Sequence, residues 1–72
     1  MKYNKKQQRK LNKLVGTKVW FKADEFYPRE HLRVIEFSFS DGIAYFSDDN
    51  DGGGEAPIED IENLNNLIGE IK

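Results

Sequence analysis

The stretch DDNDGGGE at residues 48–55 holds the densest group of oxygen-bearing side chains in the chain. A calcium loop of the EF-hand type needs oxygen ligands at positions 1, 3 and 5, glycine at 6 and a bidentate glutamate at 12. If the loop begins at Asp48, position 5 is Gly52, which has no side-chain oxygen. If it begins at Ser47, position 12 is Ile58. Neither register supplies the ligands, so we expect no metal site and no cofactor.

The same stretch is instead expected to be a flexible, strongly negative connection between two ordered segments. Glycine supplies positive φ angles in such connections, and Asp and Asn form local turns. Its carboxylates also offer a candidate acidic interaction surface for a basic protein partner. That surface comprises Asp48, Asp49, Asp51 and Glu55.

Residues suited to covalent or acid–base catalysis are sparse. The chain has no Cys and a single histidine, His31. A nucleophile needs a base and an orienting group within hydrogen-bond reach. Ser38, Ser40 and Ser47 fall in expected strands, without a strained elbow motif around them. Because carboxylates in a flexible loop are not held at a fixed separation, we predict that the protein is not an enzyme.

Charge is distributed unevenly along the chain. Residues 1–23 hold eight Lys/Arg and no acidic residue, whereas residues 24–72 hold three Lys/Arg and thirteen Asp/Glu. A Lys-rich arm can neutralise phosphates, with little sequence specificity because few base-reading side chains accompany it. The alternative is a solvated helix face that partly neutralises the acidic body. The candidate phosphate-binding arm comprises Lys2, Lys5, Lys6, Arg9, Lys10 and Lys13.

The elements that would position these groups begin with a helix over residues 4–14. Leu11, Leu14 and Val15 follow helical spacing, and a glycine comes next, as is common after a helix. Residues 1–15 are therefore expected to form a basic N-terminal helix or arm.

A strand is predicted next, over residues 17–23, with the sequence TKVWFKA. Alternation along a strand places Val19 and Phe21 on one face and Trp20 on the other. A loop that contains Pro28 follows.

Two alternating runs then flank Asp41-Gly42, a pair that favours a two-residue hairpin turn of type I′. That turn would place Phe39 opposite Ala44. A slip by one residue would expose several phenylalanines, so the register is strongly specified. The predicted core face of this hairpin comprises Ile35, Phe37, Phe39, Ala44 and Phe46.

Residues 57–72 allow two interpretations. Apolar residues recur at spacings of three and four, and Pro57 suits the first position of a helix. Several asparagines and Gly69 oppose a long helix. The second interpretation makes EAP a short strand, IEDI a 3₁₀ turn and NLIGEI a final strand.

With the second interpretation, VGTKVWFKA, a Pro-containing loop, RVIEFSFSDGIAYFSDD and APIEDIENL together resemble a small SH3-like barrel of the KOW/Tudor type. The resemblance covers residues 16–68 and extends to the short SH3-like proteins that phages and prophages encode. It implies a mainly β fold, a strongly bent antiparallel barrel at residues 16–72 with an N-terminal basic helix. The alternative is an α+β fold, a three-stranded antiparallel meander with a helix at each end.

Exposed aromatic residues form the third candidate site. SH3-like and Tudor-like barrels bind peptides or methylated side chains through clustered aromatics, so the resemblance implies an aromatic binding surface. The alternative is that Leu11, Leu14 and Val15 cover this face as a helical lid, which leaves an acidic surface for a basic partner. The candidate aromatic surface comprises Trp20, Phe26, Tyr27 and Tyr45.

These features predict a single small binding module without enzymatic activity, a phage-type accessory protein that binds and modulates a protein partner. The alternative function is phosphate-directed, weakly sequence-specific nucleic-acid binding through the Lys-rich helix. The chain has 72 residues, enough for one domain. It has no apolar run of the ~20 residues that cross a bilayer, and no signal-peptide pattern. We expect a cytoplasmic monomer or small homo-oligomer without membrane association.

Overall fold

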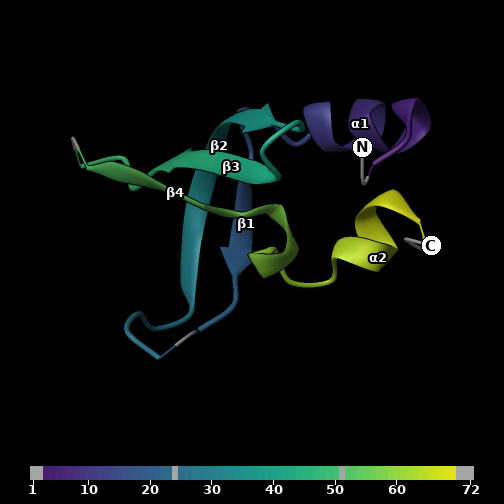
Figure 1. The fold of residues 1–72 in the computed structure, drawn as a ribbon. Helices are drawn as coiled ribbons and strands as arrows, with labels where there is room; N and C mark the ends of the chain where they lie inside the picture. Colours follow the sequence, from purple (N-terminus) through teal and green to yellow (C-terminus); the bar gives the residue numbers. More distant parts are fainter. Residues whose placement is uncertain (1–2, 24, 51, 70–72) are drawn as a thin grey trace.

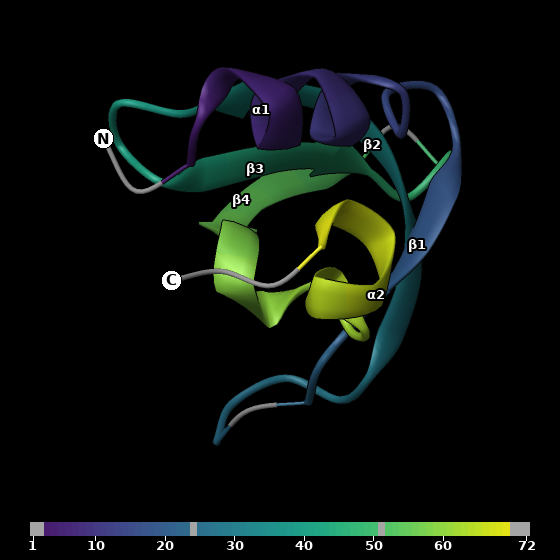
Figure 2. The ribbon, with the colours of Figure 1, turned by 90° about the vertical axis from the view of Figure 1, so that its right-hand side faces the viewer.

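The computed structural model describes residues 3–23, 25–50 and 52–69. Four antiparallel strands form an open sheet in the order β1-β2-β3-β4. The strands are β1 (Lys18–Phe21), β2 (Glu30–Ser38), β3 (Ile43–Ser47) and β4 (Gly53–Pro57). The helical elements are α1 (Lys5–Asn12), the 3₁₀ turn η1 (Ile58–Asp60) and α2 (Leu64–Ile68). Both views show α1 and α2 at the same end of the molecule, on the same side of the curved sheet (Figures 1 and 2).

The predicted N-terminal helix is confirmed, and its start is defined by a capping box. The Asn4 side chain accepts a hydrogen bond from the Gln7 N–H at 2.8 Å, and the Gln7 side chain accepts one from the Asn4 N–H at 3.0 Å. Such reciprocal bonds satisfy backbone donors that the first helical turn leaves unpaired. The chain then turns through Gly16, whose φ of +88° is readily adopted only by glycine.

A single hydrophobic core joins the helices to the sheet. Leu11 of α1 is fully buried in the same cluster as Val19 and Phe21 of β1. Trp20 points to the opposite face, so the predicted lid over Trp20 is wrong: α1 covers the core face of the sheet. The buried apolar residues are Tyr3, Leu11, Val19, Phe21, Leu32, Val34, Phe37, Ala44, Ile58, Ile61, Leu64 and Ile68.

The β2–β3 hairpin exists, but its predicted turn and register are wrong. Phe37 pairs with Ala44 and Ser38 with Ile43, so the connection spans residues 39–42 rather than two residues. A type I′ turn needs positive φ at both central residues, whereas Gly42 has positive φ and Asp41 does not. Phe39 leaves the ladder because its ring packs against Phe37, with centroids 5.7 Å apart.

A β-bulge changes which residues of β2 face the core. The ladder shifts between Val34, which pairs with Phe46, and Glu36, which pairs with Tyr45. The bulge places one extra residue, Ile35, on β2, and such an insertion reverses the inward and outward alternation beyond it. Ile35, a predicted core residue, is therefore 54% exposed, while its neighbour Val34 is completely buried.

The C-terminal region follows the second interpretation only in its first part. The short strand and the 3₁₀ turn are confirmed as β4 and η1. The final strand is wrong for the described residues, which form α2, and Glu70 and Ile71 lie outside them. The single long helix is wrong as well, because Ile61 is extended and makes an isolated bridge to Phe21. The apolar spacing therefore reflects a chain that returns repeatedly to one core.

The fold is thus mainly β, and β4 excludes the three-stranded alternative. The SH3-like barrel stays a hypothesis, because the four strands form an open sheet. In the described chain, the segment after η1 meets β1 through the bridge between Ile61 and Phe21 and through two hydrogen bonds beside it. In these, the Lys22 N–H donates to the Asp60 carbonyl at 2.7 Å and the Glu62 N–H to the Trp20 carbonyl at 2.8 Å. Within the described ranges, no helix is both long and apolar enough to cross a membrane.

Candidate functional site

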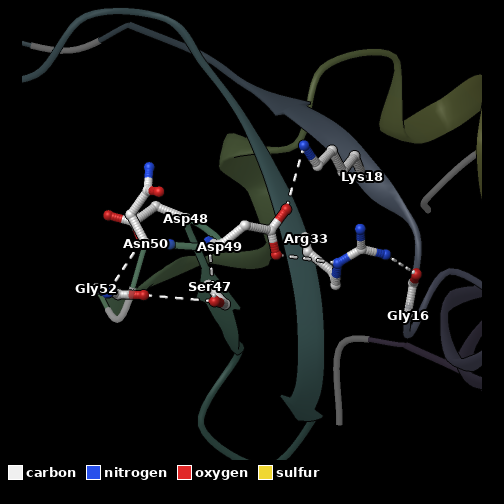
Figure 3. A network of polar contacts seen from close by, with 8 residues as sticks. All are labelled: Gly16, Lys18, Arg33, Ser47, Asp48, Asp49, Asn50 and Gly52. Atoms are coloured by element: carbon white, nitrogen blue, oxygen red, sulfur yellow. Dashed lines mark hydrogen bonds and ion pairs between the residues drawn. The ribbon is translucent and has the colours of Figure 1, made fainter.

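The acidic loop between β3 and β4 is ordered by contacts to the outer face of the sheet (Figure 3). The Asp49 carboxylate lies 3.2 Å from Lys18 Nζ and 3.2 Å from Arg33 Nε. Asp49 itself has a φ of +66°, an unusual conformation for a residue other than glycine. Hydrogen bonds from Arg33 and then Lys18 hold the pKa of the Asp49 carboxyl below its ordinary value. The loop is therefore pinned to β1 and β2.

A second set of bonds closes the loop on itself. Asp48 Oδ1 accepts hydrogen bonds from the Asn50 N–H at 2.8 Å and the Gly52 N–H at 3.0 Å. The Ser47 hydroxyl accepts one from the Asp49 N–H at 3.2 Å. The described residues of the loop therefore share a defined set of hydrogen bonds, and the flexibility expected of this connection stays a prediction. Asp and Asn form local turns there, as predicted.

The glycines of this loop serve packing rather than positive φ. Positive φ at described glycines occurs at Gly16, Gly42 and Gly69, outside this stretch. A Cβ at Gly52 would lie 2.3 Å from Asp48 Oδ2, and one at Gly53 would lie 2.7 Å from the Phe46 carbonyl oxygen. The Phe46 carbonyl is backbone and leaves no room for a Cβ at Gly53. The Asp48 carboxylate is a side-chain end and could turn away from a Cβ at Gly52, but only by giving up its hydrogen bonds to the loop backbone.

The candidate acidic surface is therefore divided between structural and exposed roles. Asp48 and Asp49 are exposed but hold the loop together. Glu55 is exposed on β4, opposite Tyr45. Asp51 lies outside the described residues. Among the residues that the structure describes, no group of three or more His, Asp or Glu could hold a metal ion.

The candidate aromatic surface does not form one cluster. Trp20 pairs with His31 near the start of β2, whereas Tyr45 pairs with Glu36 near its end. The Trp20 ring stacks on His31 at 4.5 Å, and Arg29 Cζ lies 3.8 Å from the Trp20 ring centroid. The indole is therefore already engaged by a cation of the same chain.

The loop between β1 and β2 presents the other two aromatics. Phe26 is 82% exposed and Tyr27 is 67% exposed. Arg29 at the end of this loop forms an ion pair with Glu62, which precedes α2. The loop is thus tied at its base, while most of the surface of its two aromatic side chains is exposed.

The candidate phosphate-binding arm lies on the outward face of α1. Lys5, Lys6, Arg9 and Lys13 are exposed and Lys10 is half-buried. Lys2 lies outside the described residues. In the described part of the chain, the ion pairs use Lys18, Arg29 and Arg33 rather than the α1 cations. The expected neutralisation of the acidic body by the arm is therefore absent from these contacts.

A groove of about 450 Å³ lies between the β1–β2 loop and β4, and sequence reasoning missed it. Phe21, Leu32 and Phe46 contribute its apolar floor, while Tyr27 and Pro28 form part of one wall. The opposite wall is strand β4 itself. Its charged rim comprises Glu30, Asp48, Glu55 and Asp60, against the single cation Lys22. The glycines at the start of β4 were the sequence feature that could have indicated the groove. Their lack of side chains leaves space there only because of how the sheet curves, which the sequence does not show.

Comparisons with known protein families, with curated proteins and with solved structures found no match for this chain. The functional argument therefore rests on the groove, the aromatic loop and the basic helix. Of the residues considered for catalysis, Ser38 ends β2, far from His31 near its start, and its hydroxyl donates a hydrogen bond to Asp41. Ser47 lies opposite Arg33, two residues from His31, and its hydroxyl accepts a hydrogen bond from the Asp49 N–H.

Proposed function

We propose that the chain is a small non-enzymatic binding module that holds a protein partner in the groove beside the aromatic loop. One observation carries the proposal. Two large aromatics, Phe26 and Tyr27, are mostly exposed on a loop tied at its base, and Tyr27 lines a groove with an apolar floor. Aromatic side chains are enriched in interface cores, where burying them stabilises a complex.

The proposal predicts which exposed apolar residues matter. Affinity capture with the tagged full chain, from a lysate of the source organism, is compared by quantitative mass spectrometry across variants. The double variant Phe26→Ala/Tyr27→Ala should lose at least tenfold of the enrichment of a specific partner, in line with the cost of removing interface hot spots. The control Ile35→Ala removes an exposed side chain from the other face of the sheet. Equal capture by both variants would overturn the proposal.

Nucleic-acid binding by α1 is the second candidate, and a specific observation favours it. The α1 cations remain without carboxylate partners in the described structure, so they are available to phosphates. Anisotropy of labelled duplex DNA should show log affinity falling with log salt at a slope of about −0.9 per phosphate contact. Replacing Lys6, Arg9 and Lys13 by Gln should flatten that slope, whereas Lys22→Gln on the groove rim should not.

Deleting residues 1–10 is not a clean test, because Tyr3 is part of the core. The neutralising variants avoid this difficulty, since all three positions are exposed. Absence of DNA binding at about 50 mM salt would rule out this second function, because non-specific phosphate binding strengthens steeply at low salt.

A further inference from the structure

Strand β4 forms an edge of the sheet that is open to pairing. Within the described ranges, β4 pairs with β3 and with no other strand. Every second residue of an antiparallel strand directs its N–H and C=O groups away from its neighbour. Edge strands are commonly protected by lysines, prolines or bulges. Here Pro57 blocks the last position, while residues 53–56 read Gly-Gly-Glu-Ala.

The glycines of β4 also leave the groove floor accessible. A Cβ built at Gly54 would lie 3.2 Å from the Phe46 ring, so a side chain at this position would project over that ring. With glycine there, the ring of Phe46 lines the groove together with Phe21 and Leu32. An extended segment lying along β4 would place every second side chain toward this apolar floor, since side chains alternate between the faces of a strand.

The carboxylates around the groove indicate which side chains such a segment would carry on its outer face. Four carboxylates stand on the groove rim against one ammonium group. In the part of the chain that is described, the ion pairs engage Asp49 and Glu62 and none of the four rim carboxylates. Glu55 lies on the outer face of β4 in register with Tyr45. A segment with basic side chains on its outer face would complement this charge.

We propose that the groove binds an extended segment of a partner protein, with alternating apolar and basic residues, which adds to the sheet as a strand beside β4. Its apolar side chains contact Phe21, Leu32 and Phe46, and its basic side chains lie beside Glu55 on the outer face of the sheet. This inference rests on the proposed protein-binding function and names the class of partner. A second copy of this chain fits less well, because two β4 strands side by side would bring Glu55 residues together.

Three fluorescent peptides test the pairing and the charge: Ac-KVKVKVK-amide, its acidic counterpart Ac-EVEVEVE-amide, and the basic peptide with alternate backbone nitrogens methylated. The basic peptide should bind, and added salt should weaken it. The acidic peptide should bind at least tenfold more weakly because the rim repels it. The methylated peptide should lose at least tenfold, because it lacks several backbone hydrogen bonds and each costs on the order of 1 kcal/mol. Amide shifts in the ¹⁵N spectrum should concentrate at residues 53–56.

Matched variants assign the site on the protein. Glu55→Gln should weaken the basic peptide about threefold, the range of an exposed ion pair. Glu36→Gln removes a carboxylate from the same outer face, two strands away, and should leave affinity unchanged. Gly54→Val should block binding by filling the groove. Its thermal melt shows whether it folds, and the Glu55 comparison stands independently.

Several outcomes would overturn the inference. Equal binding of the basic and acidic peptides would mean a non-specific apolar surface, and equal binding of the methylated peptide would exclude strand pairing. Concentration-dependent dimerisation that Gly54→Val abolishes would identify the occupant as a second copy. If no peptide binds while partner capture still depends on Phe26 and Tyr27, the proposed function stands and strand addition to β4 is wrong.

Discussion

At the scale of a single residue, Tyr3 combines a favourably buried ring with a buried hydroxyl that opposes folding. Its ring is buried against Phe39, with centroids 6.4 Å apart, but its hydroxyl has no hydrogen-bond partner in the described structure. A buried polar group without a partner costs about 1–3 kcal/mol. Tyr3→Phe should therefore raise the free energy of unfolding by about 1 kcal/mol, measured by urea denaturation. A destabilised Tyr3→Phe protein would contradict this account of the Tyr3 hydroxyl.

The same hydroxyl predicts a dependence on alkaline pH. Burial, and then the charge of Glu59, raise the pKa of Tyr3 from 10.0 to about 12. Because the folded state keeps the proton longer than the unfolded state, this contribution to stability is complete below pH 10 and disappears as pH rises toward 12. The difference in stability between the wild type and Tyr3→Phe should therefore grow across this window. A constant difference would show that Tyr3 titrates normally.

Asp49 controls the order of the acidic loop rather than the stability of the whole fold. Asn tolerates positive φ as Asp does, but it cannot form the ion pairs with Lys18 and Arg33. Asp49→Asn should speed amide hydrogen exchange at Asn50 and Gly52 and leave the melting temperature nearly unchanged. Because the pKa of Asp49 lies below 3.8, the wild-type contacts are present above that pH and are lost as pH falls through the lowered value. Unchanged amide exchange in the variant would contradict the role of the Asp49 ion pairs with Lys18 and Arg33 in ordering the loop.

At the scale of elements, the β-bulge in β2 makes neighbouring residues unequal. Val34→Ala should destabilise the protein by about 2 kcal/mol, as expected when a buried side chain is truncated. Ile35→Ala should stay within about 0.5 kcal/mol, because its side chain is largely exposed. Urea unfolding of both variants checks this difference. The hairpin register expected from sequence predicts the reverse order, so the pair discriminates between the two arrangements.

The bulge also shows where sequence reasoning succeeds and where it fails. Alternation correctly placed Val19 and Phe21 on one face and Trp20 on the other, because β1 is short and regular. It failed for Ile35, since a bulge is set by packing across strands and leaves no local signal. The Asp41-Gly42 pair indicated a turn, but the turn lengthened because burying Phe39 in part against the core outweighed a local preference.

Candidate sites were predictable only so far as they depended on local sequence. The basic residues of α1 follow from helical spacing and lie on the outward face that this spacing leaves exposed. The groove could not be predicted, because it joins Tyr27, Phe46 and Gly54 from three separate segments. The ion pairs of Asp49 were missed for the same reason: Lys18 and Arg33 come close to Asp49 only when β1, β2 and β3 pair.

For the molecule as a whole, the segregation of charge in the sequence becomes a segregation in space. Helix α1, which carries the basic residues, lies at the end of the molecule where α2 also lies (Figure 1). The carboxylates of Glu30, Asp48, Glu55 and Asp60 line the groove between β4 and the β1–β2 loop. The two proposed partners differ accordingly in charge: a basic segment for the groove and an anionic partner for α1.

The last prediction concerns whether α1 is an independent arm or part of one cooperative unit. Leu11 is fully buried and shares the core with Ile61 and Ile68. Leu11→Ala should cost about 2–5 kcal/mol, comparable to the ~3–5 kcal/mol that a core in a chain this small supplies. Val15→Ala, at an exposed position, is the control. Urea unfolding followed by Trp20 fluorescence and by far-ultraviolet circular dichroism should shift together for Leu11→Ala, because both signals report one transition. If the fluorescence transition of the sheet stayed in place while helical signal was lost, α1 would be a separate arm, and it could then bind phosphate without carrying the sheet with it.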